Sequence, residues 1–263
     1  MVGGQDVFSV DGHRIVVVGG TAGIGLGVAA HLVEAGATVV ITGRRDGVDI
    51  AAGVGAAFVR MDVADRASVA DAFRQIGDQL GAIDCLILNA GIDEWHGEAT
   101  DIDLDVFERV VDINTLGVVR ALAAGIGLVP EGGSVVVTSS PAGSITTPGM
   151  AAYSASKAAL DMLVRTWALE LGPKRIRVNA VLPGIVESEM DGADTTQVEV
   201  IRRMTANGVF RHAREMGPVY QFLASPASVT LTGSLVGAHD GISVGFSAEV
   251  MEHLAAGVGD GEA

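Results

Sequence analysis

The strongest constraint on the fold is a strand, a glycine-rich turn and a helix that follow one another near the start of the chain. Residues 14–18 form an apolar, β-branched run typical of a buried strand. A glycine-rich turn follows, and residues 26–34 have a helical pattern. This order can hold a pyrophosphate on backbone N–H groups and a helix N-terminus. The spacing Gly19-x-x-x-Gly23-x-Gly25 departs from the usual G-x-G-x-x-G, and a simple tight turn is the alternative. At this first strand–helix junction we expect nucleotide binding.

Strand and helix patterns alternate along the chain. Strands are predicted near 14–18, 37–42, 56–60, 83–88, 133–139, 175–181 and 234–239, and helices near 23–35, 65–80, 103–124, 150–171 and 213–224. Such alternation predicts an α/β fold with a Rossmann-type doubly wound parallel sheet in three α/β/α layers. With 263 residues and 49% hydrophobic content, the chain can bury its core as one domain over residues 1–263.

One long irregular segment is predicted at about residues 185–212, after Pro183-Gly184. Loops of this length are usually functional or disordered. The segment carries several carboxylates and then an apolar pair: Glu187, Glu189, Asp191, Asp194, Val209 and Phe210. We therefore expect a mobile substrate lid with an acidic outer face.

A tyrosine and a lysine stand four residues apart, as Tyr153 and Lys157, on one face of a predicted helix. A phenol with an ordinary pKa of about 10 is a poor acid or base at neutral pH. A fixed cation beside it favours the phenolate, so we expect Lys157 to lower the pKa of Tyr153. Such a pair can exchange a proton with an alcohol or a developing alkoxide. By itself, the pair is also compatible with an amphipathic helix whose lysine reaches solvent.

Six sequence elements, in order over about residues 10–245, resemble short-chain dehydrogenases/reductases of the ordinary single-domain type. They are the glycine spacing, Asn89-Ala90-Gly91, Asn114, Ser140 after a Val-rich strand, Tyr153 with Lys157, and residues 179–184. The chain departs from the family pattern at Val18, Leu88 and Ser188, where the family has Thr, Asn and Thr. It also has Ile242 in place of the second glycine of an Asp-Gly-Gly turn, which puts the form of that turn and a subunit contact in question.

The resemblance implies hydride transfer between a nicotinamide and a carbonyl or secondary alcohol. In this comparison Tyr153 exchanges the substrate proton, Ser140 binds the substrate oxygen, Lys157 holds the nicotinamide ribose, and Asn114 fixes a water that links Lys157 to solvent. The implied cofactor-binding residues are Gly19, Thr21, Gly23, Ile24, Gly25, Arg44, Arg45, Asp62, Val63, Asn89, Ala90, Gly91, Tyr153, Lys157, Pro183, Gly184, Val186 and Ser188.

The end of the second predicted strand bears on the choice of nicotinamide cofactor. NAD sites present a carboxylate there to the ribose 2′-OH, whereas NADP sites present a cation to the 2′-phosphate. Gly43 stands where an NAD enzyme of the family usually has Asp, and Arg44 and Arg45 follow, suited to clamp a phosphate. Asp46 complicates this reading, since it can neutralise one of the two arginines. We predict NADP, with NAD as the alternative, and we expect Asp62 with Val63 to contact the adenine.

The sequence does not name the substrate. The expected pocket is mostly apolar and consists of Trp95, His96, Pro141, Ala142, Ile145, Val186, Met190 and Phe210. This lining favours a hydrophobic or cyclic ketone, and we predict an NADPH-dependent ketone reductase. Two alternatives stay open: an NAD-dependent alcohol or diol dehydrogenase, and a non-catalytic regulatory protein that keeps the nucleotide site.

Composition limits the classes of binding partner and the cellular location that we expect. The net charge of −15 argues against nucleic acid or anionic membranes as partners. Cys85 is the single cysteine and lies in a predicted strand, which excludes disulfides and favours a cytoplasmic location. The six histidines show no metal-ligand spacing, the segment before Arg14 is unlike a signal peptide, and no apolar run reaches the ~18 residues of a membrane span.

A homotetramer is expected. The family resemblance implies that the 103–124 and 150–171 helices pair between subunits. The sequence adds support, because the 150–171 helix is apolar on more than one face. One face can cover the sheet, and the other needs a partner.

Overall fold

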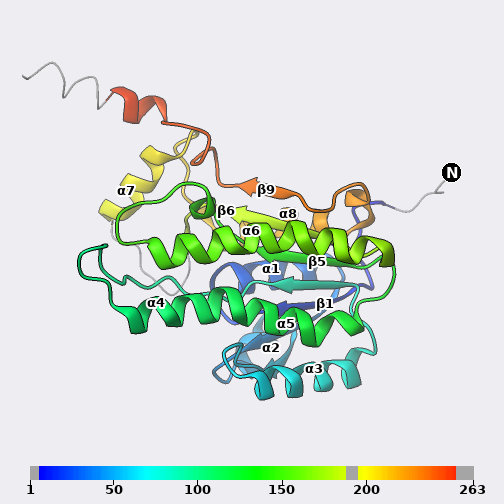
Figure 1. The fold of residues 1–263 in the computed structure, drawn as a ribbon. Helices are drawn as coiled ribbons and strands as arrows, with labels where there is room; N and C mark the ends of the chain where they lie inside the picture. The colour runs from blue at the N-terminus through cyan, green and yellow to red at the C-terminus, as the bar shows by residue number, and fades with distance from the viewer. Residues whose placement is uncertain (1–5, 188–194, 253–263) are drawn as a thin grey trace, which may run out of the picture.

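A seven-stranded parallel sheet forms the centre of the computed structural model, which describes residues 6–187 and 195–252 (Figure 1). Its strands are β1 (Arg14–Val18), β2 (Thr38–Gly43), β3 (Ala57–Arg60), β4 (Cys85–Leu88), β5 (Ser134–Thr138), β6 (Arg177–Pro183) and β9 (Leu235–Ala238). The strand order is β3-β2-β1-β4-β5-β6-β9. The order reverses between β1 and β4, and in sheets of this kind ligands bind outside the carboxyl ends of the strands at that point.

Helices cover both faces of the sheet (Figure 1). One face carries α1 (Gly23–Glu34), α2 (Val48–Gly53) and α8 (Gly217–Ala224), and the other carries α3 (Arg66–Leu80), α4 (Leu104–Val111), α5 (Gly117–Gly125) and α6 (Ala151–Leu171). A π-helical turn, Asp112–Leu116, joins α4 to α5. The 3₁₀ turns are Ile126–Leu128, Pro141–Gly143, Gly172–Lys174, Ala213–Met216 and Pro226–Ser228.

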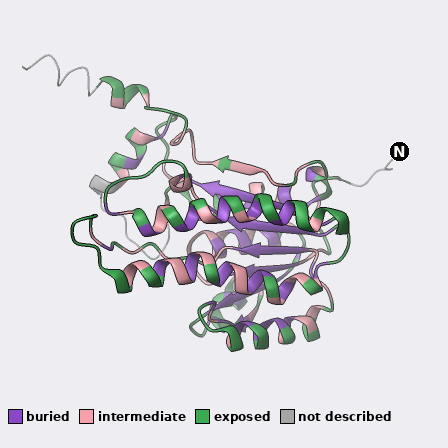
Figure 2. Cartoon of the chain, in the orientation of Figure 1, coloured by how far each residue is buried: buried purple, intermediate pink, exposed green. Residues whose placement is uncertain are grey.

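The side chains of β1 alternate between two cores. Ile15 and Val17 pack with α1 and α8, whereas Val16 and Val18 pack with α3, α5 and α6. A strand buried on both faces needs apolar residues at every position, and this explains the continuous β-branched run in the sequence. Figure 2 shows the same division, with buried strands between helices whose outer faces are exposed.

The predicted fold class is confirmed, and the seven predicted strands match the sheet to within about two residues at each end. Two helices were missed, α2 and α7 (Thr195–Met204). The expectation of one irregular segment over 185–212 was therefore wrong, because α7 lies in it. Its flanks, β7 (Val186–Glu187) and β8 (Arg211–His212), also pair with each other in parallel.

By length and composition alone, one helical run in the described part of the chain, Leu104–Leu128, is apolar enough to cross a membrane. Val110, Ile113 and Val118 on this run belong to the core beneath it. The apolar character of the run is thus that of a helix that covers the sheet on one side.

Candidate active site

One large cavity opens at the carboxyl ends of the strands, where the strand order reverses. Its volume is about 1180 Å³, above the roughly 300–1,000 Å³ usual for a pocket that holds one small ligand. The glycine-rich turn lines one part of the cavity, and the chain beyond β9 lines another. The cavity therefore has room for a dinucleotide and a second molecule beside it.

The glycine-rich turn is shaped by close backbone packing. Gly19 has a φ of +80°, and a Cβ on it would lie 2.6 Å from the Cα of Ala90. A Cβ on Gly25 would lie 2.1 Å from the carbonyl oxygen of Gly19. The side-chain amide of Asn89 donates to that same oxygen at 2.8 Å and ties the turn to the end of β4. Gly25 thus supports the turn from behind rather than lining the cavity.

The N-terminus of α1 is open to the cavity. Its N-cap residue, Ala22, has no side chain that can satisfy the first N–H groups of the helix. Thr21, Gly23 and Ile24 all line the cavity at this point. Unsatisfied N–H groups at a helix N-terminus are a ready anion site, so this end suits a pyrophosphate.

The end of β2 presents two arginines to the cavity. A Cβ on Gly43 would lie 2.6 Å from the hydroxyl of Thr21, so the Asp of an NAD site does not fit here without a shift. Arg44 and Arg45 line the cavity and are exposed. Asp46 accepts a hydrogen bond from the N–H of Val48 at 3.2 Å. No ion pair engages either arginine in the part of the chain that the structure describes, so both cations are available to a ligand.

Most of the other expected cofactor residues lie on the same wall. Asp62 and Val63, after β3, lie beside this region, and Asp62 accepts from the N–H of Ala64 at 3.0 Å. The remaining described wall residues of this set are Asn89, Ala90, Gly91, Pro183, Gly184 and Val186. Ser188 lies outside the described residues.

Three of the four expected catalytic residues meet in the cavity. Ser140 follows β5 and accepts a hydrogen bond from the N–H of Ala142 at 3.1 Å, while Tyr153 and Lys157 lie one turn apart on α6. The Lys157 ammonium donates to the carbonyl oxygen of Thr138 at 3.0 Å and lies 5.5 Å from the centre of the Tyr153 ring.

Burial, rather than the lysine, dominates the proton affinity of Tyr153. Burial raises the pKa of Tyr153, a hydrogen bond with Ser140 lowers it, and the charge of Asp93 raises it. Burial also lowers the pKa of Lys157 to about 8, against the opposing charges of Asp161 and Asp93. The pKa of Tyr153 is thus raised overall, with burial as the largest cause, and the lowering of this pKa by Lys157 stays a prediction.

Asn114 lies behind the cavity wall, in the π-helical turn, and is fully buried. Its amide oxygen accepts from the N–H of Ile92 at 2.8 Å, and its amide nitrogen donates to the carbonyl of Ile92 at 2.8 Å and to the hydroxyl of Ser156 at 3.2 Å. A π-helical turn inside an α-helix frequently marks a functional site. The side chain here fixes the segment next to Gly91, which borders the Lys157 ammonium.

The expected substrate pocket is only partly correct. Pro141, Ala142 and Ile145 line the cavity as predicted. Trp95 does not line it, because its exposed ring lies over Gly149. Phe210 is also off the cavity wall, since it lies in the chain after α7 that leads into β8, and Met190 lies outside the described residues.

His96 has a structural position. It is buried, its Nε2 accepts from the N–H of Ala152 at 2.9 Å, and its ring packs edge-on against Phe107 with centroids 5.4 Å apart. The histidine therefore caps the first turn of α6, where Met150 has no capping side chain. Its prediction as a pocket residue was wrong for this reason.

Sequence reasoning missed two parts of the cavity wall. Asp93, two residues after Gly91, lines the cavity, and partial burial raises its pKa while the charge of Lys157 lowers it. The chain beyond β9 was also missed, and its wall residues are Ile242, Ser243, Val244, Gly245, Phe246, Ser247 and Val250. The one signal for this second part was the departure from the family pattern at Ile242.

Comparisons with known proteins agree with this geometry. The family model adh_short_C2, described as "Enoyl-(Acyl carrier protein) reductase", matches residues 19–243. "Short-chain dehydrogenase reductase 5" of Arabidopsis thaliana is 34% identical over 89% of this chain and 96% of its own length. "Versicolorin reductase 1" of Dothistroma septosporum is 32% identical over 90% of this chain and 98% of its own.

A solved structure is also similar. A short-chain dehydrogenase from Burkholderia cenocepacia J2315, crystallised in complex with NADP, superposes with a TM-score of 0.83 at 30% identity. The match covers 89% of this chain and 99% of that one. Together with the sequence relatives, it shows that this chain belongs to the short-chain dehydrogenase/reductase family and is an NAD(P)-dependent oxidoreductase.

Proposed function

We propose that this protein is an NADPH-dependent reductase of apolar ketones. The observation that carries the proposal is the meeting of Ser140 and Tyr153 in one cavity, with the buried Lys157 ammonium behind them. Two neighbouring hydroxyl groups on the wall of one cavity suit a carbonyl oxygen that gains negative charge. When bound, the cofactor supplies the hydride.

The proton chemistry favours reduction at neutral pH. A phenol whose pKa is raised by burial keeps its proton there, so Tyr153 is ready to donate it to a developing alkoxide. Ser140 donates a hydrogen bond to the same oxygen. At pH values below its pKa of about 8, Lys157 keeps most of its positive charge and holds that charge beside the phenol. The Asn114 amide also holds the residue 91–92 segment beside Lys157, and its expected role of fixing a water that links Lys157 to solvent stays part of the proposal.

The choice of NADP rests on the end of β2. A carboxylate in place of Gly43 does not fit unless the Thr21 side chain shifts, and two exposed arginines follow Gly43 on the cavity wall. The Burkholderia cenocepacia relative was crystallised with NADP, which supports the same choice. An NAD-dependent alcohol or diol dehydrogenase is the alternative.

The description of the matching family model raises a second function, reduction of the carbon–carbon double bond of an enoyl thioester. Both reactions consume NADPH, so the substrate panel must separate them. We favour the ketone because Ser140 and Tyr153 address one oxygen atom.

The test is a titration of intrinsic and nicotinamide fluorescence with NADPH and NADH, followed by turnover assays. The panel contains cyclohexanone, 2-decalone, a vicinal diol with NAD or NADP, and crotonyl thioester. We expect tighter binding of NADPH and turnover of the ketones. Tighter binding of NADH with turnover of the diol, or turnover of the thioester alone, would replace the proposal with the corresponding alternative.

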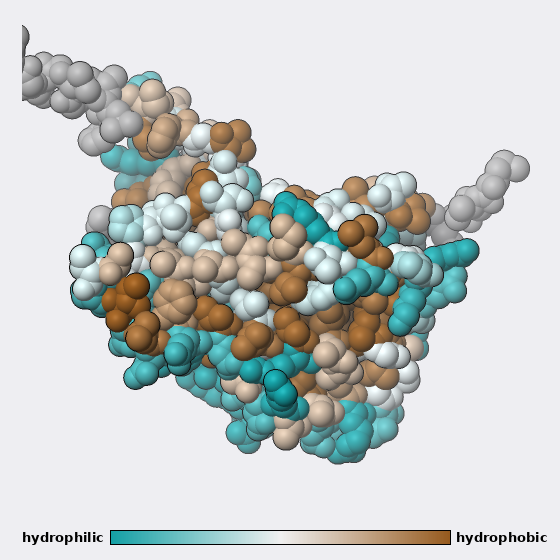
Figure 3. All heavy atoms as spheres, viewed as in Figure 1, coloured by the Kyte–Doolittle hydropathy of each residue, from teal (hydrophilic) through white to brown (hydrophobic). Residues whose placement is uncertain are grey.

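We also propose a cytoplasmic homotetramer. Figure 3 shows apolar surface gathered over the α4–α5 and α6 region. The exposed apolar residues on these helices and the turn between them are Leu104, Leu116, Met162 and Leu169. Apolar patches of this kind mark interfaces, and closed symmetry is the usual result. Light scattering should give about four times the chain mass of 26.8 kDa, and a monodisperse monomer at micromolar concentration contradicts the assembly.

A further inference from the structure

The chain beyond β9 forms the end of the cavity that the cofactor residues leave open. Residues 239–252 run from the carboxyl end of β9 along α7 (Figure 1). Their contribution to the cavity wall is mostly apolar, and Met204 on α7 and Ile145 after β5 lie on the wall of the same cavity. We call residues 241–247 the C-terminal wall.

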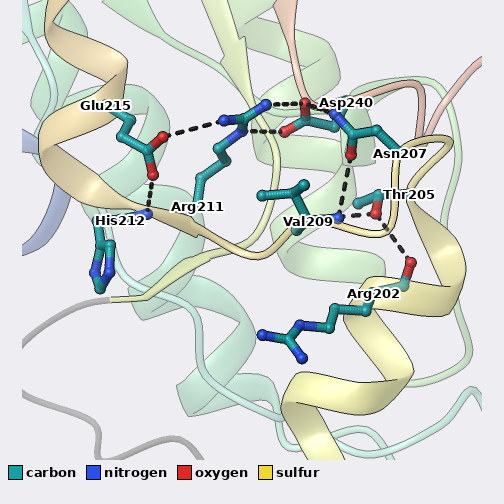
Figure 4. Close-up of polar contacts among 8 residues, drawn as sticks. All are labelled: Arg202, Thr205, Asn207, Val209, Arg211, His212, Glu215 and Asp240. Atoms are coloured by element: carbon teal, nitrogen blue, oxygen red, sulfur yellow. Dashed lines mark hydrogen bonds and ion pairs between the residues drawn. The ribbon is translucent and has the colours of Figure 1, made fainter.

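A polar cluster anchors the start of the C-terminal wall (Figure 4). The Arg211 guanidinium donates to both carboxylate oxygens of Asp240, at 3.0 and 3.1 Å, and the amide of Asn207 donates to the same carboxylate at 2.6 Å. The N–H of Ala206 donates to the Asp240 carbonyl at 2.8 Å. Bidentate pairs of this kind hold a fixed geometry as well as charge. The end of β9 is thereby tied to the segment that follows α7.

The backbone turns sharply at this anchor. Asp240 has a φ of +49° and Gly241 a φ of +85°. The left-handed region is costly for most residues, but Asp is among those that tolerate it best. Ile242, which follows, lies outside that region, and its N–H donates to the carbonyl oxygen of His239 at 3.1 Å. The missing second glycine of the family turn is therefore accommodated without backbone strain at Ile242, and its place is taken by an apolar side chain on the cavity wall.

A second anchor holds the other end of the C-terminal wall. The hydroxyl of Ser247 donates to the carbonyl oxygen of Arg203 on α7. The Arg203 guanidinium also lies 3.2 Å from the Glu249 carboxylate. Residues 241–246 are thus held between two attachments to α7 and the segment after it.

Two apolar side chains of the C-terminal wall are exposed to solvent, which is unfavourable for hydrocarbon groups. Val244 is 84% exposed and Phe246 is 77% exposed, although both line the cavity. Burial of apolar surface is favourable, so an apolar molecule in the cavity gains from covering these side chains. The same continuous cavity contains Ser140 and Tyr153, which bind a polar oxygen.

We propose that Ile242, Val244 and Phe246 determine substrate specificity by receiving the hydrocarbon body of a ketone whose carbonyl oxygen meets Ser140 and Tyr153. The inference rests on the proposed function and deepens it to a substrate class, ketones with a fused-ring or similarly bulky apolar body. It also assigns a role to the departure from the family turn at Ile242.

The test compares kcat/KM with NADPH for a bulky ketone, 2-decalone, and a small one, cyclohexanone. The variants are Phe246→Ala and Ile242→Gly, and Phe8→Ala is the matched control, since Phe8 is an exposed phenylalanine that packs on Phe222 away from the cavity. We expect kcat/KM for 2-decalone to fall about tenfold or more in Phe246→Ala, and less in Ile242→Gly. The value for cyclohexanone should fall far less, and the Kd of NADPH should stay the same.

A second readout keeps this inference separate from the proposed reaction. Calorimetric titration of the NADP-loaded protein with 2-decalone measures binding without turnover, and we expect weaker binding in both variants than in the Phe8→Ala control. If no ketone is turned over but the variants still bind 2-decalone more weakly, the proposed reaction is contradicted, while the role of the C-terminal wall in binding the hydrocarbon body is supported. If the variants leave the ratio of kcat/KM for 2-decalone to that for cyclohexanone unchanged, and also leave 2-decalone binding unchanged, the proposed role of the C-terminal wall is wrong. Dissociation of the oligomer by Phe246→Ala at unchanged selectivity would overturn it too, because the residue would then contact a second copy.

Discussion

The two ends of the cavity are built differently. At the cofactor end, strand termini and the glycine-rich turn pack so closely that a single Cβ at Gly19 or Gly25 collides with backbone atoms. At the substrate end, the wall consists of the segment after β9, held by ion pairs and carrying exposed apolar side chains. Close packing fixes the glycine-rich turn, whereas polar contacts hold the C-terminal wall. In the proposed function, substrate specificity can therefore change at the wall while the turn stays undisturbed.

The largest effect is expected at the point where the two ends meet. Tyr153→Phe removes the proton that the developing alkoxide needs but leaves the glycine turn, Lys157 and the arginines in place. Loss of a positioned acid typically costs ~10²–10⁴-fold in rate. We expect turnover to fall by this factor while the Kd of NADPH, measured by fluorescence, changes little. Near wild-type turnover would remove Tyr153 from the mechanism.

A smaller effect, confined to the cofactor end, is expected from Arg44→Ala. The contact with a 2′-phosphate exists with NADPH and not with NADH, and charge-assisted hydrogen bonds are worth about 1.5–3 kcal/mol. The ratio of the two dissociation constants should therefore shift toward NADH by roughly 10- to 150-fold. Arg66→Ala, a change at an exposed arginine off the cavity wall, should leave the ratio unchanged. If Arg44→Ala behaves like this control, the phosphate contact lies elsewhere.

Gly25→Ala tests the rigidity of the cofactor end directly. The added Cβ meets the Gly19 carbonyl oxygen at 2.1 Å, a backbone atom that cannot move without opening the turn. Overpacking typically costs about 1–3 kcal/mol. We expect a lower free energy of unfolding in urea and weaker NADPH binding. Gly53→Ala on α2, where a Cβ has open space, is the matched control. Equal behaviour of the two variants would contradict the idea of a rigid end.

The same contrast explains which features the sequence could predict. The β-branched run of β1, the glycine spacing and Arg44 are local patterns whose consequences follow from strand and turn geometry. The sheet was therefore predicted, and most of the expected cofactor residues line the cavity. His96 was assigned to the substrate pocket as one of a mostly apolar set of candidates. Its actual partner, the N–H of Ala152, is 56 residues away, and no local pattern shows that contact.

The C-terminal wall was missed for a related reason. Val244 and Phe246 have no helical or strand period, and their place depends on the contact between Arg211 and Asp240, which are 29 residues apart. Helix α7 is a different case, because Val198, Ile201 and Met204 recur every three residues and form an apolar stripe that the sequence does show. The contact between Arg211 and Asp240 follows from no such pattern. Such long-range contacts have to be seen in the structure.

Asp93 offers the finest test, because it lies on the cavity wall near the reacting groups without being one of them. Its negative charge raises the pKa of Tyr153 and also that of Lys157. Asp93→Asn removes both influences, and both pKa values should fall. In alcohol oxidation the rate rises as Tyr153 loses its proton, so the midpoint of the pH–rate profile should move to lower pH.

Removal of the Asp93 charge lowers the pKa of each group, so the sign of the shift does not depend on which one the profile reports. The measurement is kcat/KM for alcohol oxidation from pH 7 to pH 10.5. Glu94→Gln is the matched control, since Glu94 is the next residue but pairs with Arg109 and does not line the cavity. If the midpoint of the pH–rate profile does not change in Asp93→Asn, or changes equally in the control, the Asp93 charge does not influence the pKa of Tyr153. A shift in Asp93→Asn alone would show that a residue outside the catalytic set adjusts the pH at which the common chemistry operates.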